Sequence, residues 1–204
     1  MTSRERIRRI FRREPTDRIG AYESFWTETV RRWTAEGHLR EGEDVGERFG
    51  LDITQTRPLN LVADLAFGRQ VIEQTPTYAL LKDGNGAILR KELPAGGAPR
   101  YVDFTVRERR DWEERVKPLL APSPKRIALD AYRRDLEAAR RAERFCFLGN
   151  RLIFQTIEMV CGHEHMLAGM ALDPDWARDM ADTYARLLVG LLEIAFREVG
   201  KPDG

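Results

Sequence analysis

The chain has 204 residues, 42% of them hydrophobic, which is enough apolar material for a globular domain with a buried core. Its 34 basic and 33 acidic side chains leave a net charge of +1, so nothing in the overall charge favours nucleic acid or an anionic membrane as a partner. The two cysteines make no disulfide framework and suit a reducing, cytoplasmic environment, and no apolar run approaches the roughly 20 residues that span a bilayer.

The N-terminal segment MTSRERIRRIFRRE predicts a helix that Thr2 or Ser3 can cap. Its apolar positions lie at helical spacing, at Ile7, Ile10 and Phe11. The arginines would also suit a transit peptide, but such peptides avoid acidic residues like those present here, so we expect an ordinary helix with a solvated basic face. Pro15 ends this helix, and the residues up to Ser24 predict a turn followed by a short strand.

Two helices and a strand are expected next. Residues 25–37 predict a helix that Gly37 ends, because its aromatic and apolar positions recur at helical spacing. Residues 43–50 predict a third, shorter helix, and residues 51–54 predict a short buried strand.

Residues 71–103 have a different pattern, which predicts antiparallel strands. TYALLKD and AILRKEL flank the tripeptide GNG, which is a hairpin signal, and APRYVDFTV then predicts another strand or an extended connection. The DGNG sequence lacks the lysine and the strand–loop–helix setting of a phosphate-binding loop, so we interpret it as a turn.

The second half of the chain is mainly helical. Residues 106–120 and 130–143 predict helices on either side of a proline-rich linker, and residues 144–149 predict a short buried strand. Residues 152–162 predict another helix, and a final long helix starts at Pro174 with Asp173 as its cap. Short buried strands that alternate with longer helices indicate an α/β protein with a parallel sheet.

Five segments match one known pattern: SRERIRRIFRREPTDRIGAYESFW, FGLDI, the hairpin with the RDWEER helix that follows it, FLGNRLIFQTIEMVCG and LAGMALDPDWARDM. Together they resemble the uroporphyrinogen decarboxylase family, which includes tetrapyrrole decarboxylases and cobalamin-linked methyltransferases. The resemblance implies a (β/α)8 TIM barrel with the hairpin, at about 71–103, as an embellishment. Such barrels typically take about 250 residues, so we expect residues 1–204 to form one incomplete domain, roughly the N-terminal half. An open sheet edge would favour self-association into a homo-oligomer.

The resemblance also implies a choice between two branches. Decarboxylases of the family bind their substrate with an Arg-rich segment after the first strand, an Asp after the second strand, and a Tyr. The corresponding positions here hold AYESFWTETV, Leu59 and Ile157, and Asp64 would replace the Asp only if the alignment slips. These departures favour the methyltransferase-like branch, which moves a methyl group between a small substrate or thiol and a corrinoid, often carried on a separate protein.

Members of that branch use zinc to activate the thiol. The resemblance places their zinc ligands beyond residue 204, so we expect no cofactor within this chain, which by itself should be inactive; zinc, a corrinoid and a corrinoid protein belong to the complete enzyme. Two alternatives stay open: a uroporphyrinogen decarboxylase with a divergent site, and a non-catalytic half-barrel that binds a small molecule.

Barrel active sites lie at the carboxyl ends of the strands, and two such ends can be located. The first offers Glu23, with Trp26 nearby, and the second offers Asn150 and Arg151. Glu23 can bind a cation or a metal-bound ligand, Asn150 can hydrogen-bond a substrate, and Arg151 can hold a carboxylate or phosphate. The competing interpretations are a helix cap for Glu23, turn chemistry for Asn150 and a surface charge for Arg151.

The segment CGHEHMLAGM raises the question of a metal site. Cys161, His163 and His165 would share one face of a strand, but a helix turns His163 about 200° away from Cys161. Because the apolar residues after Gly162 repeat at helical spacing, we expect a loop and the start of a helix with incidental histidines here, in preference to a metal site. Glu158, within the apolar helix, should pair with a basic side chain or face a cavity.

Overall fold

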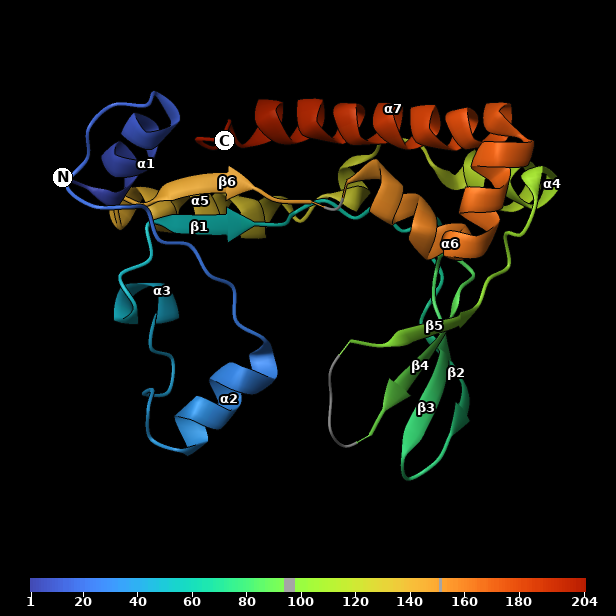
Figure 1. Cartoon of the computed structure of the whole chain (residues 1–204), viewed down its shortest axis with the longest axis horizontal. Coiled ribbons are helices and arrows are strands. Elements are labelled where there is room, and N and C mark those ends of the chain that lie inside the picture. Colours follow the sequence, from blue (N-terminus) through green and yellow to red (C-terminus); the bar gives the residue numbers. More distant parts are fainter. Residues whose placement is uncertain (94–97, 151) are drawn as a thin grey trace. The chain divides into compact units, whose positions relative to one another are not determined.

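The computed structural model describes residues 1–93, 98–150 and 152–204 (Figure 1). It divides the chain into two compact units. Unit 1 comprises Met1–Pro58, Ala128–Gly149 and Glu198–Gly204, and unit 2 comprises Leu59–Ile127 and Asn150–Arg197.

Unit 1 is built around a pair of parallel strands, β1 (Ile53–Thr56) and β6 (Phe145–Leu148). Its helices are α1 (Ser3–Phe11), α2 (Thr27–Ala35), α3 (Val45–Arg48) and α5 (Leu129–Arg141). Helices α1 and α5 both pack on the strand pair, and α5 does so through the buried side chains of Tyr132, Leu136 and Ala139. The helix packing explains why β6 is apolar, with Phe145 and Cys146 buried.

The helix ends of unit 1 follow the predicted chemistry. The Thr2 hydroxyl caps α1 by accepting a hydrogen bond from the Glu5 amide at 3.2 Å, and Asp44 caps α3 in the same way. Helix α2 ends before Gly37, whose φ of 79° lies in the left-handed region that favours glycine.

The last two residues of the chain lie along the outer edge of β6. The Leu148 amide donates to the Gly204 carbonyl at 2.9 Å, and the Gly204 amide donates to the Cys146 carbonyl at 3.2 Å. This alternation is the pattern of a parallel pairing. The buried Asp203 carboxylate, 5% exposed, accepts hydrogen bonds from Arg4 and Arg8 of α1 and thereby holds this segment in place.

Unit 2 contains an antiparallel sheet of four strands in the order β2 (Gln70–Gln74), β3 (Tyr78–Lys82), β4 (Ile88–Glu92) and β5 (Arg100–Asp103). The predicted hairpin is confirmed, because β3 and β4 pair with Lys82 opposite Ile88 across the GNG turn. Gly86 has a φ of 80°, a conformation that a side chain would strain.

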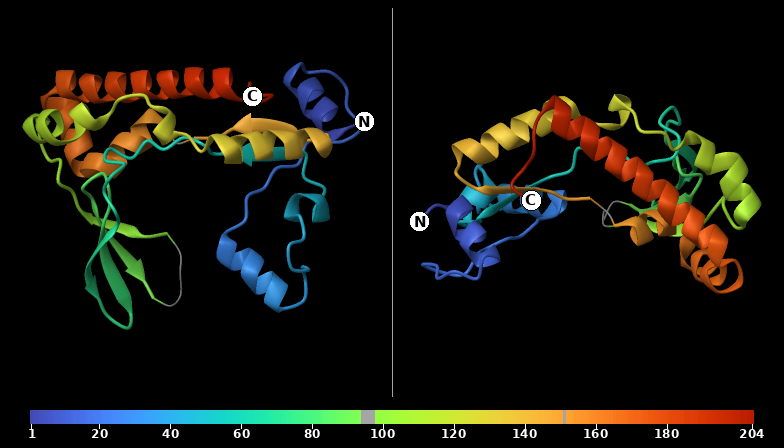
Figure 2. Two further views of the ribbon diagram at one scale, coloured as in Figure 1. Left: turned by 180° about the vertical axis from the view of Figure 1, so that it is seen from behind. Right: turned by 90° about the horizontal axis from the view of Figure 1, so that it is seen from above.

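The remaining elements of unit 2 are helical. They are α4 (Arg109–Asp111), the π-helical η1 (Trp112–Val116), the 3-10 helices η2 (Lys117–Leu119) and η3 (Pro124–Arg126), α6 (Ile153–Leu172) and α7 (Pro174–Glu198). Helices α6 and α7 join at Asp173, where the chain reverses direction (Figure 2). Their core side chains are fully buried, chiefly those of Val160, Met180, Tyr184, Leu187 and Leu191.

A buried arginine holds the loop of unit 2 that precedes the sheet. Arg126 is 3% exposed, and its guanidinium donates to the backbone carbonyls of Ala63 at 2.9 Å and Leu119 at 2.7 Å, among others. Burial lowers the pKa of Arg126. Backbone carbonyl oxygens, in place of a carboxylate, accept the hydrogen bonds of this guanidinium. The side chain therefore cross-links two loops and is not available to a ligand.

The predicted (β/α)8 barrel is wrong for this structure. Its described residues form a two-stranded parallel sheet and a separate four-stranded antiparallel sheet, and neither closes on itself. The prediction of a parallel arrangement holds only for β1 and β6. The residues between them enter an antiparallel meander whose strands pair with one another, so they add nothing to the parallel sheet.

The strand predicted before Ser24 is also absent from residues 12–26, all of which the structure describes. A backbone hydrogen bond from the Asp52 amide to the Ala21 carbonyl, at 2.8 Å, joins this segment to the residue before β1. In the described part of the chain, no helix combines the length and apolar character needed to cross a bilayer.

Candidate functional site

The carboxyl ends of the parallel strands are the first place to look for a ligand site, because open α/β sheets bind ligands there. Strands β1 and β6 run in the same direction and end at Thr56 and Leu148, which are directly opposite each other (Figure 1). The residues at this end of unit 1 are Gln55 and Arg57 from β1 and its continuation, and Gly149, which directly follows β6.

Gln55 is the centre of a small polar cluster at these strand ends. Its side-chain oxygen Oε1 accepts a hydrogen bond from the Tyr22 hydroxyl at 3.0 Å and another from Nη2 of Arg57 at 2.7 Å. Since a guanidinium can only donate, the oxygen of the amide must face Arg57, and the NH2 group takes the opposite position. We call Tyr22, Gln55 and Arg57 the strand-end cluster.

Arg57 is the only charged member of the strand-end cluster. Its side chain is exposed, and among the described residues its one hydrogen-bond partner is the neutral amide of Gln55. No carboxylate of the described chain pairs with it, so its positive charge is oriented but not neutralised. A guanidinium in this state is suited to hold a carboxylate or phosphate of a ligand.

A ring contact and a hydrogen bond hold the surroundings of the cluster in place. The Tyr22 ring meets the Phe147 ring edge-on, with centroids 5.6 Å apart and an interplanar angle of 76°. Tyr22 is nevertheless 44% exposed, so one part of its ring faces solvent. Below the cluster, the hydroxyl of the buried Thr56 donates to Asp135 of α5 at 2.7 Å and anchors the end of β1.

The structure locates three of the four residues proposed from the sequence. Glu23 and Trp26 are exposed in unit 1, Trp26 at 63%, and the Glu23 carboxylate accepts a hydrogen bond from the Ser24 amide at 2.8 Å. Asn150 is half-buried and belongs to unit 2, and Arg151 lies outside the described residues. The substrate-binding role of all four stays a prediction.

Sequence reasoning missed the strand-end cluster although Tyr22 is next to Glu23. The reason is the predicted strand, which ended at residue 54 and left Gln55 and Arg57 in an unassigned loop. The observed β1 extends to Thr56, so the sequence QTR marks its carboxyl end. Applying the strand-end rule to this strand as well would have identified both side chains.

The Cys and His residues of α6 do not converge. The segment is helical after Gly162 as predicted, but the predicted loop is reduced to a break at Gly162, whose φ of 74° and ψ of 164° are not helical. Cys161 is fully buried, and burial raises its pKa to about 12, whereas the His163 side chain is 61% exposed. His163 Nδ1 lies 3.4 Å from Glu158, so the expectation that Glu158 has a basic partner is confirmed.

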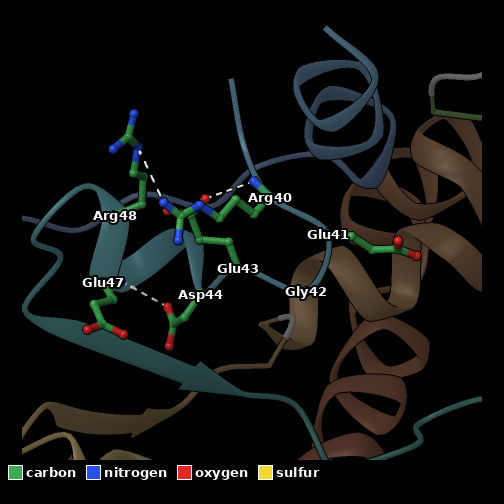
Figure 3. A pocket seen from close by; sticks show the side chains of 7 residues that line it. All are labelled: Arg40, Glu41, Gly42, Glu43, Asp44, Glu47 and Arg48. Atoms are coloured by element: carbon green, nitrogen blue, oxygen red, sulfur yellow. Dashed lines mark hydrogen bonds and ion pairs between the residues drawn. The ribbon is translucent and has the colours of Figure 1, made fainter. Parts of the chain in front are cut away.

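A hollow in unit 1, lined by residues 40–44, 47 and 48, is a weaker candidate (Figure 3). Within this loop the Glu43 carboxylate accepts a hydrogen bond from the Arg40 backbone amide at 2.8 Å, and the Arg48 guanidinium lies 4.0 Å from Glu43. Glu41 points away from the other side chains (Figure 3). Glu43 is therefore engaged within the loop, and Asp44 pairs with Arg144 at 2.9 Å, so both carboxylates already have basic partners.

A cleft in unit 2 is lined by residues of the 107–113 turn and of α6. Three arginines line it, and each contacts a carboxylate: Arg107 pairs with Asp103, Arg109 with Asp173 and Arg110 with Glu114. Arg57, by contrast, pairs with no carboxylate of the described residues, and for this reason we place the candidate site at the strand ends.

Comparison with protein-family models, with curated proteins and with solved structures finds no significant match for this chain. Within the described residues, no group of three or more His, Cys, Asp and Glu side chains has the arrangement of a metal site.

Proposed function

We propose that unit 1 binds a small anionic substrate at the carboxyl ends of β1 and β6, and that this binding serves methyl transfer of the corrinoid-linked kind. The observation that carries the binding is the exposed Arg57 guanidinium, which the Gln55 amide orients at 2.7 Å and no described carboxylate neutralises. Hydrogen bonds to charged groups typically contribute about 1.5–3 kcal/mol, which corresponds to weak binding of a small anion.

The methyl-transfer part of the proposal rests on the sequence resemblance and on the missing decarboxylase residues. Ile157, which occupies the position of the substrate-binding Tyr, is 5% exposed within α6 and offers no polar group. Leu59 pairs with Ile127 in an isolated bridge. The zinc and the corrinoid that such a reaction requires are not assigned to residues of this chain.

Binding is tested by titrating the 15N-labelled chain with acetate and with inorganic phosphate at constant ionic strength. We expect saturable chemical-shift changes at the strand-end cluster and a loss of affinity of roughly tenfold or more in Arg57→Ala. Arg134→Ala is the matched control, because Arg134 is an exposed arginine of α5 in the same unit. Wild-type chain that does not bind, or Arg57→Ala that binds equally well, contradicts the proposal.

Methyl transfer is tested separately with methylcobalamin, zinc chloride and 3-mercaptopropionate, a thiol that also carries a carboxylate. The chain by itself is expected to be inactive, and we propose that the added zinc and methylcobalamin supply what it lacks. Formation of the methyl thioether, reduced in Arg57→Ala and weaker with the uncharged 2-mercaptoethanol, is then the expected result. Anion binding without any thioether would restrict the function to non-catalytic binding.

A further inference from the structure

Gly149 has no side chain, yet the geometry of the strand-end cluster depends on it. A Cβ added at this position would lie 1.8 Å from Nε2, 2.6 Å from Cδ and 2.9 Å from Cγ of Gln55. The whole amide group of Gln55 therefore occupies the space that any other residue at position 149 would need for its side chain.

Backbone conformation does not explain this glycine. Its φ is not positive, unlike the φ of other described glycines such as Gly37 and Gly162. Its amide donates to the Thr56 carbonyl at 2.9 Å, a bond that any residue except proline can make. What glycine alone provides here is room for Gln55.

The contacts link position 149 to the exposed charge in two steps. Gly149 admits the Gln55 amide, and the oxygen of that amide orients the Arg57 guanidinium at 2.7 Å and is held by Tyr22 at 3.0 Å. Displacing the amide would release Arg57 into the many rotamers of an exposed arginine, and a ligand would then have to order it on binding.

From this geometry we infer that Gly149 is a positioning residue of the anion site, acting through Gln55 on Arg57. The inference rests on the proposed anion binding at the strand ends. It assigns the affinity of the site to Gly149, which directly follows β6, as much as to the charged Arg57, which follows β1.

The test measures the binding of acetate and inorganic phosphate to Gly149→Ala, Gln55→Ala and the double variant. We expect each single variant to bind roughly tenfold more weakly than wild type, and the double variant to bind no more weakly than Gln55→Ala alone. Gly68→Ala is the control glycine, because nothing lies within 4 Å of an added Cβ there.

The outcomes separate the two proposals. Wild-type chain that binds neither anion contradicts the proposed function. Wild-type binding with unchanged affinity in Gly149→Ala, or with additive losses in the double variant, overturns the role of Gly149 and leaves the anion site standing. If Gly149→Ala does not fold, the affinity of Gln55→Ala decides, because this variant removes the amide without crowding its surroundings. Wild-type affinity in Gln55→Ala also overturns the inference.

Discussion

Asp52 is a fully buried carboxylate that connects three segments of unit 1. It accepts hydrogen bonds from Arg6 of α1 at 2.5 Å, from Arg18 at 2.7 Å and from the Ala21 amide at 2.8 Å. Burial alone would raise its pKa, but the hydrogen bonds from Arg18 and Ala21 outweigh burial and lower the pKa of Asp52 below its ordinary value. This carboxylate therefore ties the segment before α2, including Tyr22, to the start of β1.

We predict that Asp52→Asn lowers the free energy of unfolding at pH 7 by about 3 kcal/mol, because it leaves two guanidinium groups beside an uncharged side chain. Urea denaturation measures the loss. Glu41→Gln, an exposed acid in the same unit, is the control and should change stability little. A loss no larger than that of the control would show that the pairs around Asp52 contribute nothing net.

The same residue predicts a pH dependence. Because the pKa of Asp52 is lower in the folded than in the unfolded chain, its contribution is fully present above about pH 4 and is lost as the pH falls through the lower, folded value. The difference in stability between wild type and Asp52→Asn should therefore shrink in acid. Urea titrations at a series of pH values measure it, and a difference that grows in acid would contradict the assignment.

At the scale of single elements, the predicted chemistry of turns and caps was largely sufficient. Asp173 and Pro174 do begin α7, Thr2 does cap α1, and the GNG tripeptide does form the hairpin turn. These features depend on residues close in sequence, which is why they can be predicted without a fold. The prediction of a short strand before Ser24 was wrong, because a strand there requires continuous backbone pairing with β1. The Asp52 amide donates to the Ala21 carbonyl, but a single bond does not make a strand.

The α6–α7 contact gives a prediction at the same scale. A Cβ at Gly169 of α6 would lie 2.8 Å from the ring of the buried Trp176 in α7. Alanine favours helix by up to about 1 kcal/mol over glycine, yet we expect Gly169→Ala to destabilise the protein by about 1–3 kcal/mol through overpacking. Thermal unfolding measures this change.

The matched comparison is made in a Trp176→Leu background, where the ring is absent. There the alanine should be neutral or stabilising, since only its helix propensity remains. Equal destabilisation in both backgrounds would mean that the helix contact is not the cause.

At the scale of the whole molecule, both units bury a cysteine as a free thiol. Cys146 lies in β6 of unit 1 and Cys161 in α6 of unit 2, and each is at most 3% exposed. Burial is the main cause that raises the pKa of Cys146 to about 11, with Asp203 adding to it, and burial also raises the pKa of Cys161 to about 12. Neither thiol forms its reactive thiolate readily near neutral pH.

We therefore predict that both thiols resist an aromatic disulfide reagent at pH 8 while the chain is folded, since less than about one in a hundred would be thiolate. In urea both should react at the rate of ordinary cysteine. The absorbance of the released thiolate measures the reaction. A free peptide that contains one cysteine serves as the control for reagent activity, and rapid labelling of either thiol in native buffer would contradict the burial.

By itself, the sequence determined the elements. The spacing of apolar residues, the caps and the turn signals predicted most helices and strands, including the parallel-strand segments at 51–54 and 144–149, because these signals act over a few residues. It also pointed to the carboxyl ends of strands as the place for a ligand. Only the tertiary structure decided how the strands pair, and with it that the two sheets stay open and separate.

The same division holds for the candidate site. Tyr22, Gln55, Arg57 and Gly149 come from three segments of the chain. No local pattern reveals that the Gln55 amide rests on Gly149, or that no carboxylate of the described residues pairs with Arg57. Such contacts arise when β1 and β6 are brought side by side, which depends on the burial of apolar surface across the whole unit and not on any single stretch of residues.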